Sequence, residues 1–303
     1  MKNLKLKSRV FLVPITHLPE KIETVAKNEV SLIMTEGCIV GDYTFSKMQT
    51  EGPFRIDSDD YIPELKKLVE VAHKHNSYIL LSILHYGLLS SEEPIFSPNG
   101  GKGIINPKLE SKAVTKEDIL RIQDYFVQAA IRAKKAGFDG VEILGAQMNF
   151  ISSFSSIKLN QRTDEYGGNE ENRSRLFVEI VKKVKEAIGN DMIIAAKIDS
   201  TDEENGYTEN GFLTIGKNLE KAGIDLIEIS GPNGIRNADH PYFYDEAKKI
   251  AEILNIPVIC VGGIKAYEQA DFILKNSKIQ YISMARELMK NPDTVTKWFI
   301  KTY

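Results

Sequence analysis

Short apolar runs alternate with amphipathic stretches along the whole chain. The apolar runs have the length of strands, and each is followed by residues whose hydrophobic positions recur at helical spacing. The predicted strands are Val10–Pro14, Val30–Thr35, Ser77–Leu84, Gly140–Leu144, Met192–Ile198, Leu226–Ser230, Val258–Gly262 and Tyr281–Ala285. The helices expected after them are Lys21–Glu29, Asp59–Asn76, Thr115–Lys135, Glu171–Ile188, Leu213–Ala222, Asp245–Leu254, Tyr267–Lys275 and Pro292–Lys301.

This alternation predicts an α/β fold. Strands rich in Val and Ile, each followed by a helix, indicate a parallel sheet buried on both faces. Eight such units predict a (β/α)8 TIM barrel, formed as a single domain of residues 1–303. A doubly wound open sheet is the competing fold, and it is disfavoured because no Gly-x-Gly-x-x-Gly follows the first strand. Thr115 with Asp118 indicates a capping box, and Gly137 the C-cap of the same helix.

The longest connection follows the fourth predicted strand. About two dozen residues of loop are expected before a helix begins at Glu170 or Glu171, against roughly 2–6 residues in an ordinary connection of this kind. Loops at the carboxyl ends of barrel strands commonly carry catalytic groups. Taken alone, the polar run Asn160–Gly168 inside it is more typical of a solvated surface loop closed by a Gly-Gly turn, so other parts of the chain must decide.

Composition narrows the function classes. The net charge of −3 and a pI near 6.0 disfavour nucleic-acid binding. Apolar runs stay well below the ~18–20 residues that span a bilayer, and the N-terminus lacks the features of a signal peptide. The two cysteines, Cys38 and Cys260, have no partner at metal-ligand or redox spacing. We therefore expect a cytoplasmic protein without a metal, which binds a small-molecule substrate and is a possible homo-oligomer.

Two strand ends near the C-terminus predict a phosphate site. Gly262 and Gly263 end the seventh strand, and Ala285 and Arg286 end the eighth. Barrels often bind phosphate with the loops after these strands, where glycine lets backbone N–H groups approach an anion and a guanidinium clamps it. A tight turn beside a surface arginine is the alternative. The position in the fold favours the phosphate site, and thus a phosphorylated substrate or cofactor.

In the predicted barrel, the carboxyl ends of all strands surround one opening, the mouth of the barrel. Polar residues at the ends of other strands face this mouth. Thr16 follows the first strand, Gly37 the second, and Ser82 lies within the third. Lys197 lies in an otherwise apolar run near the end of the fifth strand, where a buried cation is costly unless it serves a bound anion. His85 could be either a structural or a catalytic histidine.

Several segments together resemble the Old Yellow Enzyme family of FMN-dependent ene-reductases, also called NADH:flavin oxidoreductases. They cover nearly the whole chain in order, and they are LKLKSRVFLVPIT, LIMTEG, ILHYG, FDGVEILGA, NQRTDEYGGNEENRSR, PVICVGGI and ISMARELMKNPD. The run RTDEYGG-x-x-ENR is highly specific. The resemblance implies a barrel that binds FMN at its C-terminal mouth and oxidises NADH or NADPH.

The resemblance also implies roles for individual residues. Pro14, Ile15, Thr16 and Gly37 would line the isoalloxazine ring. Lys197 stands where the family usually has an arginine near flavin N1 and O2, and a cation there favours the anionic reduced flavin. The phosphate would be held by Gly263 and Arg286 together with the backbone of Gly262 and Ala285.

The chain departs from the family where the substrate binds. The family has a His-x-x-His or His-x-x-Asn pair, followed two residues later by a tyrosine, and those positions are Leu144, Gln147 and Asn149 here. The pair hydrogen-bonds the carbonyl oxygen of an activated alkene and the tyrosine protonates its α-carbon. Leucine cannot donate, Gln147 can, and Asn149 is no acid.

Two cofactor-side positions also differ. Ser82 replaces the glutamine that reads the flavin pyrimidine edge, and Leu88 replaces an arginine. The leading hypothesis is therefore an FMN-dependent oxidoreductase with an atypical acceptor. One alternative is a degenerate barrel that binds flavin or another phosphorylated ligand without turnover. Another is a phosphate-binding lyase with Lys197 as a Schiff-base nucleophile.

Overall fold

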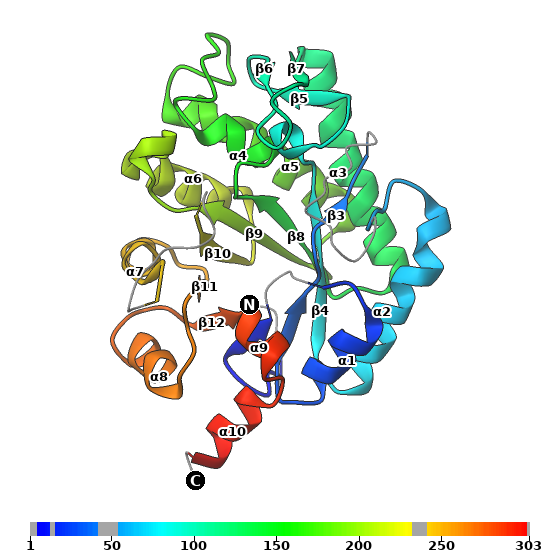
Figure 1. The fold of residues 1–303 in the computed structure, drawn as a ribbon, viewed down its shortest axis with the longest axis vertical. Coiled ribbons are helices and arrows are strands. Elements are labelled where there is room, and N and C mark those ends of the chain that lie inside the picture. The colour runs from blue at the N-terminus through cyan, green and yellow to red at the C-terminus, as the bar shows by residue number, and fades with distance from the viewer. Residues whose placement is uncertain (1–4, 13–15, 42–53, 232–240, 302–303) are drawn as a thin grey trace.

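A closed parallel barrel forms the centre of the molecule (Figure 1). The computed structural model describes residues 5–12, 16–41, 54–231 and 241–301. The barrel strands are β1 (Val10–Leu12), β2 (Leu32–Met34), β4 (Tyr78–Leu84), β8 (Gly140–Gly145), β9 (Ile193–Asp199), β10 (Leu226–Ser230), β11 (Val258–Val261) and β12 (Tyr281–Met284). They pair in the order β2-β1-β12-β11-β10-β9-β8-β4, and pairing of β2 with β4 closes the ring. The predicted (β/α)8 barrel is confirmed.

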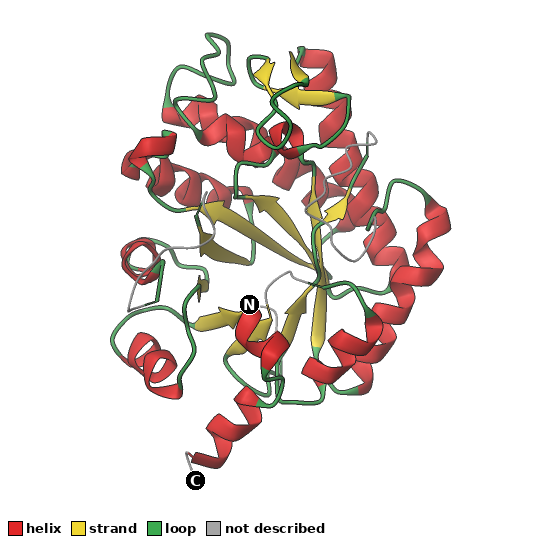
Figure 2. Ribbon diagram, in the orientation of Figure 1, coloured by secondary structure: helices red, strands yellow, loops and turns green. Residues whose placement is uncertain are grey.

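Helices surround the barrel strands, as Figure 2 shows. They are α1 (Pro19–Ala26), α2 (Ile62–Lys74), α3 (Lys116–Ala136), α5 (Glu170–Ile188), α6 (Glu209–Ala222), α7 (Tyr244–Ala251), α8 (Tyr267–Lys275), α9 (Arg286–Lys290) and α10 (Thr294–Lys301). The capping box predicted for α3 is present, since Thr115 and Asp118 each accept a hydrogen bond from the other's backbone N–H. Gly137 ends this helix with φ 92°, a conformation that favours glycine.

Two connections contain structure that the sequence pattern did not predict. The connection after β8 holds a short helix, α4 (Phe150–Ser155), so the expectation of an uninterrupted loop there was wrong. The connection after β4 folds into a small sheet of β5 (Ile95–Ser97), β6 (Gly101–Lys102) and β7 (Glu110–Ala113). Strand β3 (Cys38–Ile39) adds to the edge of β4. Both connections lie over the same end of the barrel (Figure 1).

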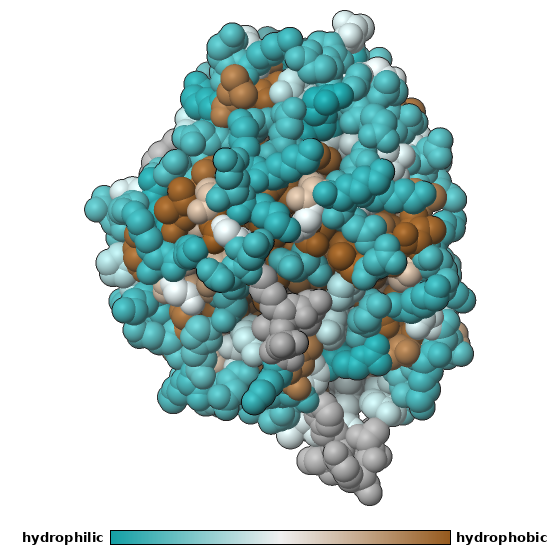
Figure 3. Space-filling view, turned by 180° about the vertical axis from the view of Figure 1, so that it is seen from behind, coloured by the Kyte–Doolittle hydropathy of each residue, from teal (hydrophilic) through white to brown (hydrophobic). Residues whose placement is uncertain are grey.

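The face of the molecule shown in Figure 3 is mainly hydrophilic, with apolar side chains between the polar ones. Among the described residues, no helix combines the length and the apolar character that a membrane crossing requires. The longest helix, α3, illustrates the pattern because its buried residues recur on one face while Lys and Glu side chains cover the other.

The polar run after α4 is a structural clamp. The Arg162 guanidinium donates to the carbonyl oxygens of Pro98 (2.9 Å) and Val114 (2.7 Å), which belong to the connection between β4 and α3. It also pairs with Asp164, with Nε 3.0 Å from Oδ1. Gly167 lies so close to Arg162 that a Cβ would be 2.2 Å from its carbonyl oxygen. The polar run therefore joins two long connections and is not part of a catalytic cluster.

Replacing Arg162 by lysine should destabilise the protein by about 2 kcal/mol, because an ammonium cannot keep the forked pattern of charge-assisted hydrogen bonds. Chemical denaturation measures this change in the free energy of unfolding. Arg175→Lys is the matched control, since among the described residues Arg175 bonds to Glu165 and Asn172, both within ten positions of it along the chain. Equal losses for the two variants would contradict a special role for Arg162.

Candidate functional site

The predicted phosphate residues lie at neighbouring strand ends. Strands β11 and β12 pair in parallel, with Val261 opposite Ser283, so Gly262 and Gly263 emerge beside Ala285 and Arg286. Both glycines have left-handed backbones, with φ 96° and 74°. A Cβ on Gly263 would lie 2.8 Å from the Tyr242 ring. Only glycine fits both the conformation and the space at this turn.

The Arg286 side chain is a cation that could bind an anion beside this turn. Arg286 begins α9, is exposed, and forms no ion pair or hydrogen bond within the described part of the chain. Ala285 precedes it and is half-buried. The turn thus brings backbone N–H groups and a guanidinium together, which is the chemistry that binds a phosphate.

A belt of buried polar side chains crosses the inside of the barrel. Lys197 Nζ lies 2.6 Å from Glu228 Oε1, and Ser283 Oγ donates to Glu228 Oε2 at 2.8 Å. On the other side, Ser82 Oγ donates to Glu142 Oε2 at 2.6 Å. Each of these five residues is at most 5% exposed. We call Ser82, Glu142, Lys197, Glu228 and Ser283 the polar belt.

The belt holds two carboxyl groups and one ammonium. Burial and the neighbouring Glu228 raise the pKa of Glu142 to about 7. Burial opposes the charge of Lys197, but Glu228 and Glu142 outweigh it, and the net effect raises the Lys197 pKa. A Schiff-base lysine needs a lowered pKa and a free amine. The lyase interpretation of Lys197 is therefore disfavoured.

Leu144 lies in a small apolar cluster of its own. The cluster comprises Ile39, Leu84, Tyr86, Leu89 and Leu144, with Met148 packed against it. Leu84 ends β4, Ile39 ends β3 and Leu144 is next to the last residue of β8, so the cluster lies at the carboxyl ends of the strands. We call it the mouth cluster. Gly37 adjoins it, since a Cβ there would be 2.1 Å from Leu84 Cδ2. The wall at the family's first donor position is apolar apart from the Tyr86 hydroxyl.

The two residues predicted as catalytic, Gln147 and Asn149, come shortly after Leu144 in the chain. Gln147 is half-buried and has φ 62°. Asn149 is buried and caps α4: its Oδ1 accepts from Ser152 N–H at 3.1 Å and its Nδ2 donates to the Leu144 carbonyl at 2.7 Å. Gln147 is thus placed near the mouth cluster, whereas both polar atoms of Asn149 are engaged within the loop. Their catalytic roles stay predictions.

The remaining predicted residues are placed less completely. Thr16 is buried after β1, and its carbonyl accepts from Glu36 N–H at 2.8 Å, which joins the ends of β1 and β2 near Gly37. Pro14 and Ile15 lie outside the described residues. Ser82 lies inside the barrel and donates to Glu142.

Sequence reasoning missed three buried acids: Glu142, Glu228 and Asp199. Each is a single carboxylate in an apolar strand, in GVEIL, LIEIS and AAKID. A lone acid in such a run was a usable signal, because burial without a partner is costly. Asp199 ends β9 and accepts from Gln147 N–H at 2.8 Å.

Known proteins resemble this chain along nearly its whole length. A family model described as NADH:flavin oxidoreductase / NADH oxidase family matches residues 1–300. The chain is 34% identical to an NADPH dehydrogenase of Halalkalibacterium halodurans, over 89% of this chain and 79% of that protein. It is 30% identical to an NADH oxidase of Thermoanaerobacter brockii over 96% of this chain, but it spans only 48% of that protein's length.

The solved structures show the same fold. An old yellow enzyme homologue from Zymomonas mobilis superposes with a TM-score of 0.81 at 24% identity, covering 98% of this chain and 89% of the other. Histamine dehydrogenase from Rhizobium gives a TM-score of 0.87 at 24% identity, with 46% of its length covered. The chain thus corresponds to the barrel portion of some longer proteins and to most of some shorter ones.

Proposed function

Because the chain belongs to the NADH:flavin oxidoreductase / NADH oxidase family, we propose that it oxidises NADH or NADPH with FMN as cofactor and reduces a small organic acceptor. Family membership supports FMN and a nicotinamide reductant. The observation that carries the proposal beyond membership is the presence, in one barrel, of a left-handed glycine turn beside the exposed Arg286 guanidinium and of a buried lysine, Lys197, inside the strands below it. The acceptor, the choice of nicotinamide and any self-association are parts of the proposal.

The residues present fit FMN. The left-handed turn at Gly262 and Gly263 presents backbone N–H groups without a side chain of its own, and the Tyr242 ring occupies the space that a Cβ would take. Arg286 supplies an exposed cation that forms no ion pair with any residue the structure describes. Gly37 keeps the wall beside Leu84 free of a side chain. Bound FMN would supply the hydride chemistry. Gly262, Gly263, Ala285 and Arg286 would hold its phosphate, and Lys197 would stabilise negative charge at the ring.

The acceptor side of the proposal rests on the mouth cluster. With Leu144 in a largely apolar wall, hydrogen-bond donation from that position is absent. Gln147 is the remaining residue of the family's donor pair that can donate to an acceptor oxygen. We therefore propose an acceptor that is held mainly by apolar contact and by at most this one side-chain donor from the pair, unlike an ordinary enone gripped by two donors.

A visible spectrum of the purified protein, followed by anaerobic titration with NADH and then NADPH, tests the proposal. The expected results are flavin absorbance and its steady bleaching by at least one of the two. Protein that lacks flavin and takes up no added FMN would contradict the proposal. Flavin that neither nucleotide bleaches would instead indicate a binding protein.

Replacing Arg286 by alanine should weaken FMN binding about 10- to 100-fold, the loss expected for charge-assisted hydrogen bonds worth roughly 1.5–3 kcal/mol. The stability of the flavin-free protein should hardly change, because the side chain is exposed. Flavin fluorescence during titration measures the dissociation constant. Lys290→Ala, an exposed residue in the same short helix, is the control and should leave the affinity unaltered. Equal FMN affinity of Arg286→Ala and wild type would show that Arg286 does not bind the phosphate.

A further inference from the structure

Two consecutive residues after β8 have an unusual backbone. Gln147 and Met148 have φ 62° and 60°. Residues with a Cβ rarely adopt this left-handed conformation, because each one costs free energy and persists only where its surroundings enforce it. A pair in succession therefore requires specific partners for the backbone.

Those partners are two buried side chains. Gln147 N–H donates to Asp199 Oδ1 at 2.8 Å, and Met148 N–H donates to Ser152 Oγ at 3.0 Å. Ser152 Oγ also bonds to Asp199 Oδ2 and lies 2.7 Å from Tyr207 Oη. Asp199, Ser152 and Tyr207 are 6%, 0% and 4% exposed. The result is a chain of hydrogen bonds from the end of β9, through α4, to the loop before α6.

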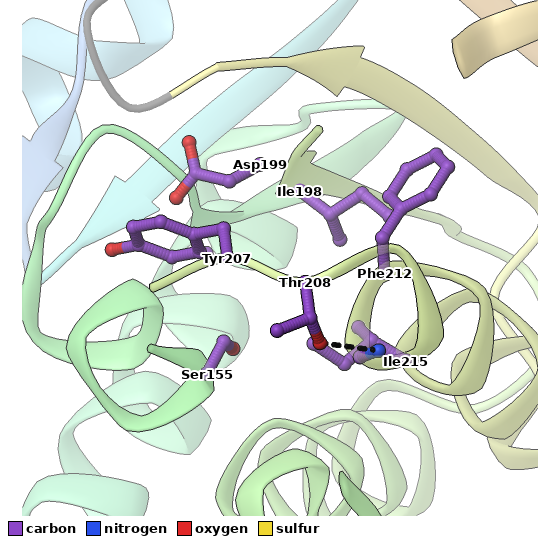
Figure 4. Close-up of a pocket in the computed structure, with 9 residues that line it drawn as sticks. Ser155, Ile198, Asp199, Tyr207, Thr208, Phe212 and Ile215 are labelled. Carbon is purple, nitrogen blue, oxygen red and sulfur yellow. Dashed lines mark hydrogen bonds between the residues drawn. The ribbon is translucent and has the colours of Figure 1, made fainter. Parts of the chain in front are cut away.

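Figure 4 shows two of these groups, Asp199 and Tyr207. The side chains of Asp199 and Tyr207 lie next to each other at one edge of a small pocket that Ile198, Thr208 and Phe212 also line. The carboxylate is thus enclosed by the barrel wall and by the start of α6. Because Asp199 belongs to a barrel strand, it fixes the two amides of the loop to the rigid part of the fold.

The same amides determine where the loop's side chains lie. Met148 packs against the mouth cluster, which includes Leu84 and Leu144. Gln147 precedes it and is half-buried. Because both N–H groups are directed to Asp199 and Ser152, the backbone cannot rotate without losing two hydrogen bonds inside the protein. The positions of both side chains at the mouth therefore depend on this pair of groups.

The hydrogen bonds can persist in both protonation states of the carboxyl group. Burial raises the Asp199 pKa to about 7, with Lys197 and the bonds from Ser152 and Gln147 lowering it and Asp202 raising it. The ionised group accepts from Ser152, and the protonated group can donate to it while Ser152 turns its own proton towards Tyr207. In either state Oδ1 still accepts from Gln147.

We propose that Asp199, with Ser152, is a positioning residue that holds Gln147 and Met148 in the left-handed conformation needed at the acceptor site. Asp199 makes no contact with the acceptor in this scheme and acts through the loop backbone. The catalytic meaning of the proposal rests on the proposed function, because the acceptor role of Gln147 belongs to it. The structural part stands independently.

Three variants test the proposal. Asp199→Leu removes both acceptors. Asp199→Asn keeps an oxygen for Gln147 N–H and an amide donor for Ser152, so it is the conservative replacement. Ser152→Ala removes the bond to Met148 N–H but leaves the bond between Asp199 and Gln147, and it serves also if Asp199→Leu fails to fold.

Hydrogen exchange of flavin-free protein is the first readout. Asp199→Leu should speed exchange of the amides of residues 147 and 148 at least about tenfold, since each loses or weakens a hydrogen bond to a buried group. Asp199→Asn should stay within about threefold of wild type, and Ser152→Ala should affect residue 148 more than residue 147. Wild-type exchange in Asp199→Leu, or equal effects in the leucine and asparagine variants, would overturn the proposal.

Steady-state kinetics of the flavin-loaded enzyme form the second readout, with NADH and menadione under anaerobic conditions. Asp199→Leu should raise the KM for menadione roughly tenfold with a smaller change in kcat, and Asp199→Asn should restore it. An unchanged KM in a variant whose loop amides exchange rapidly would overturn the positioning role. If wild-type protein shows no flavin turnover, the proposed function fails, while the exchange experiment still decides whether Asp199 holds the loop.

Discussion

Lys197→Met is expected to lower the free energy of unfolding of the flavin-free protein by about 3–5 kcal/mol, because it leaves Glu228 buried without its cation. In the flavin-loaded protein the same change should slow bleaching by NADH at least ~100-fold, the scale of losing one preorganised electrostatic group. Chemical denaturation and anaerobic stopped-flow absorbance measure the two effects. The single variant alone would mix structural damage with lost chemistry.

The double variant Lys197→Met/Glu228→Gln separates the two effects. A neutral glutamine removes the uncompensated charge and can still accept from Ser283. We expect most of the stability to return while flavin reduction stays slow. Recovery of both properties would show that Lys197 serves only the ion pair and that its proposed effect on the flavin is wrong.

Protonation of the buried carboxyls should make stability fall as pH rises. Burial raises the pKa of both Glu142 and Asp199 to about 7, whereas unfolded carboxyls titrate near 4. Between about pH 4 and 7 the folded protein therefore binds more protons at these groups than the unfolded chain, so the free energy of unfolding falls with rising pH. His85 opposes this trend, since burial lowers its pKa to about 3.

Replacing one carboxyl at a time separates its contribution to the pH dependence of stability from that of the other titrating groups. From pH 5 to 7, wild type should lose about 2–3 kcal/mol relative to Asp199→Asn, and also relative to Glu142→Gln, at 1.36 kcal/mol per pH unit for each proton. Denaturation curves measured on flavin-free protein across this range provide the comparison, and the His85 contribution cancels within each pair. Stability curves that run parallel for wild type and variant would show that the carboxyl has an ordinary pKa.

The barrel could be predicted from sequence because its signals are local. Each buried strand and each amphipathic helix shows its own period, and Thr115 and Gly137 mark the ends of α3. The small β5–β7 sheet gave no such signal, because it forms from short pieces paired across a long connection. Helix α4 was missed since only six residues, half of them serine, form it. Its Asn149 cap was the available sign.

For the candidate site, the sequence indicated which strand ends lie side by side but not the side-chain contacts between neighbouring strands. The Gly262–Gly263 turn and Arg286 come together because parallel strands bring their ends to one face. Sequence reasoning expected an anion for Lys197 but assigned that role to a ligand, whereas Glu228 on the next strand provides it. Register between strands, which pairs Lys197 with Glu228 and Ser82 with Glu142, cannot be inferred from single-strand patterns.

The mouth cluster has a consequence for engineering this scaffold. Installing the relatives' histidine at position 144 would surround an imidazole with the aliphatic side chains of Ile39, Leu84 and Leu89. The Tyr86 hydroxyl is the polar group that the cluster contains, so it could serve at most one of the two ring nitrogens at a time. A graft of ordinary ene-reductase specificity must therefore recruit polar neighbours together with the histidine. Conversely, the largely apolar wall makes the unmodified barrel suitable as a scaffold for selecting catalysts that act on apolar acceptors.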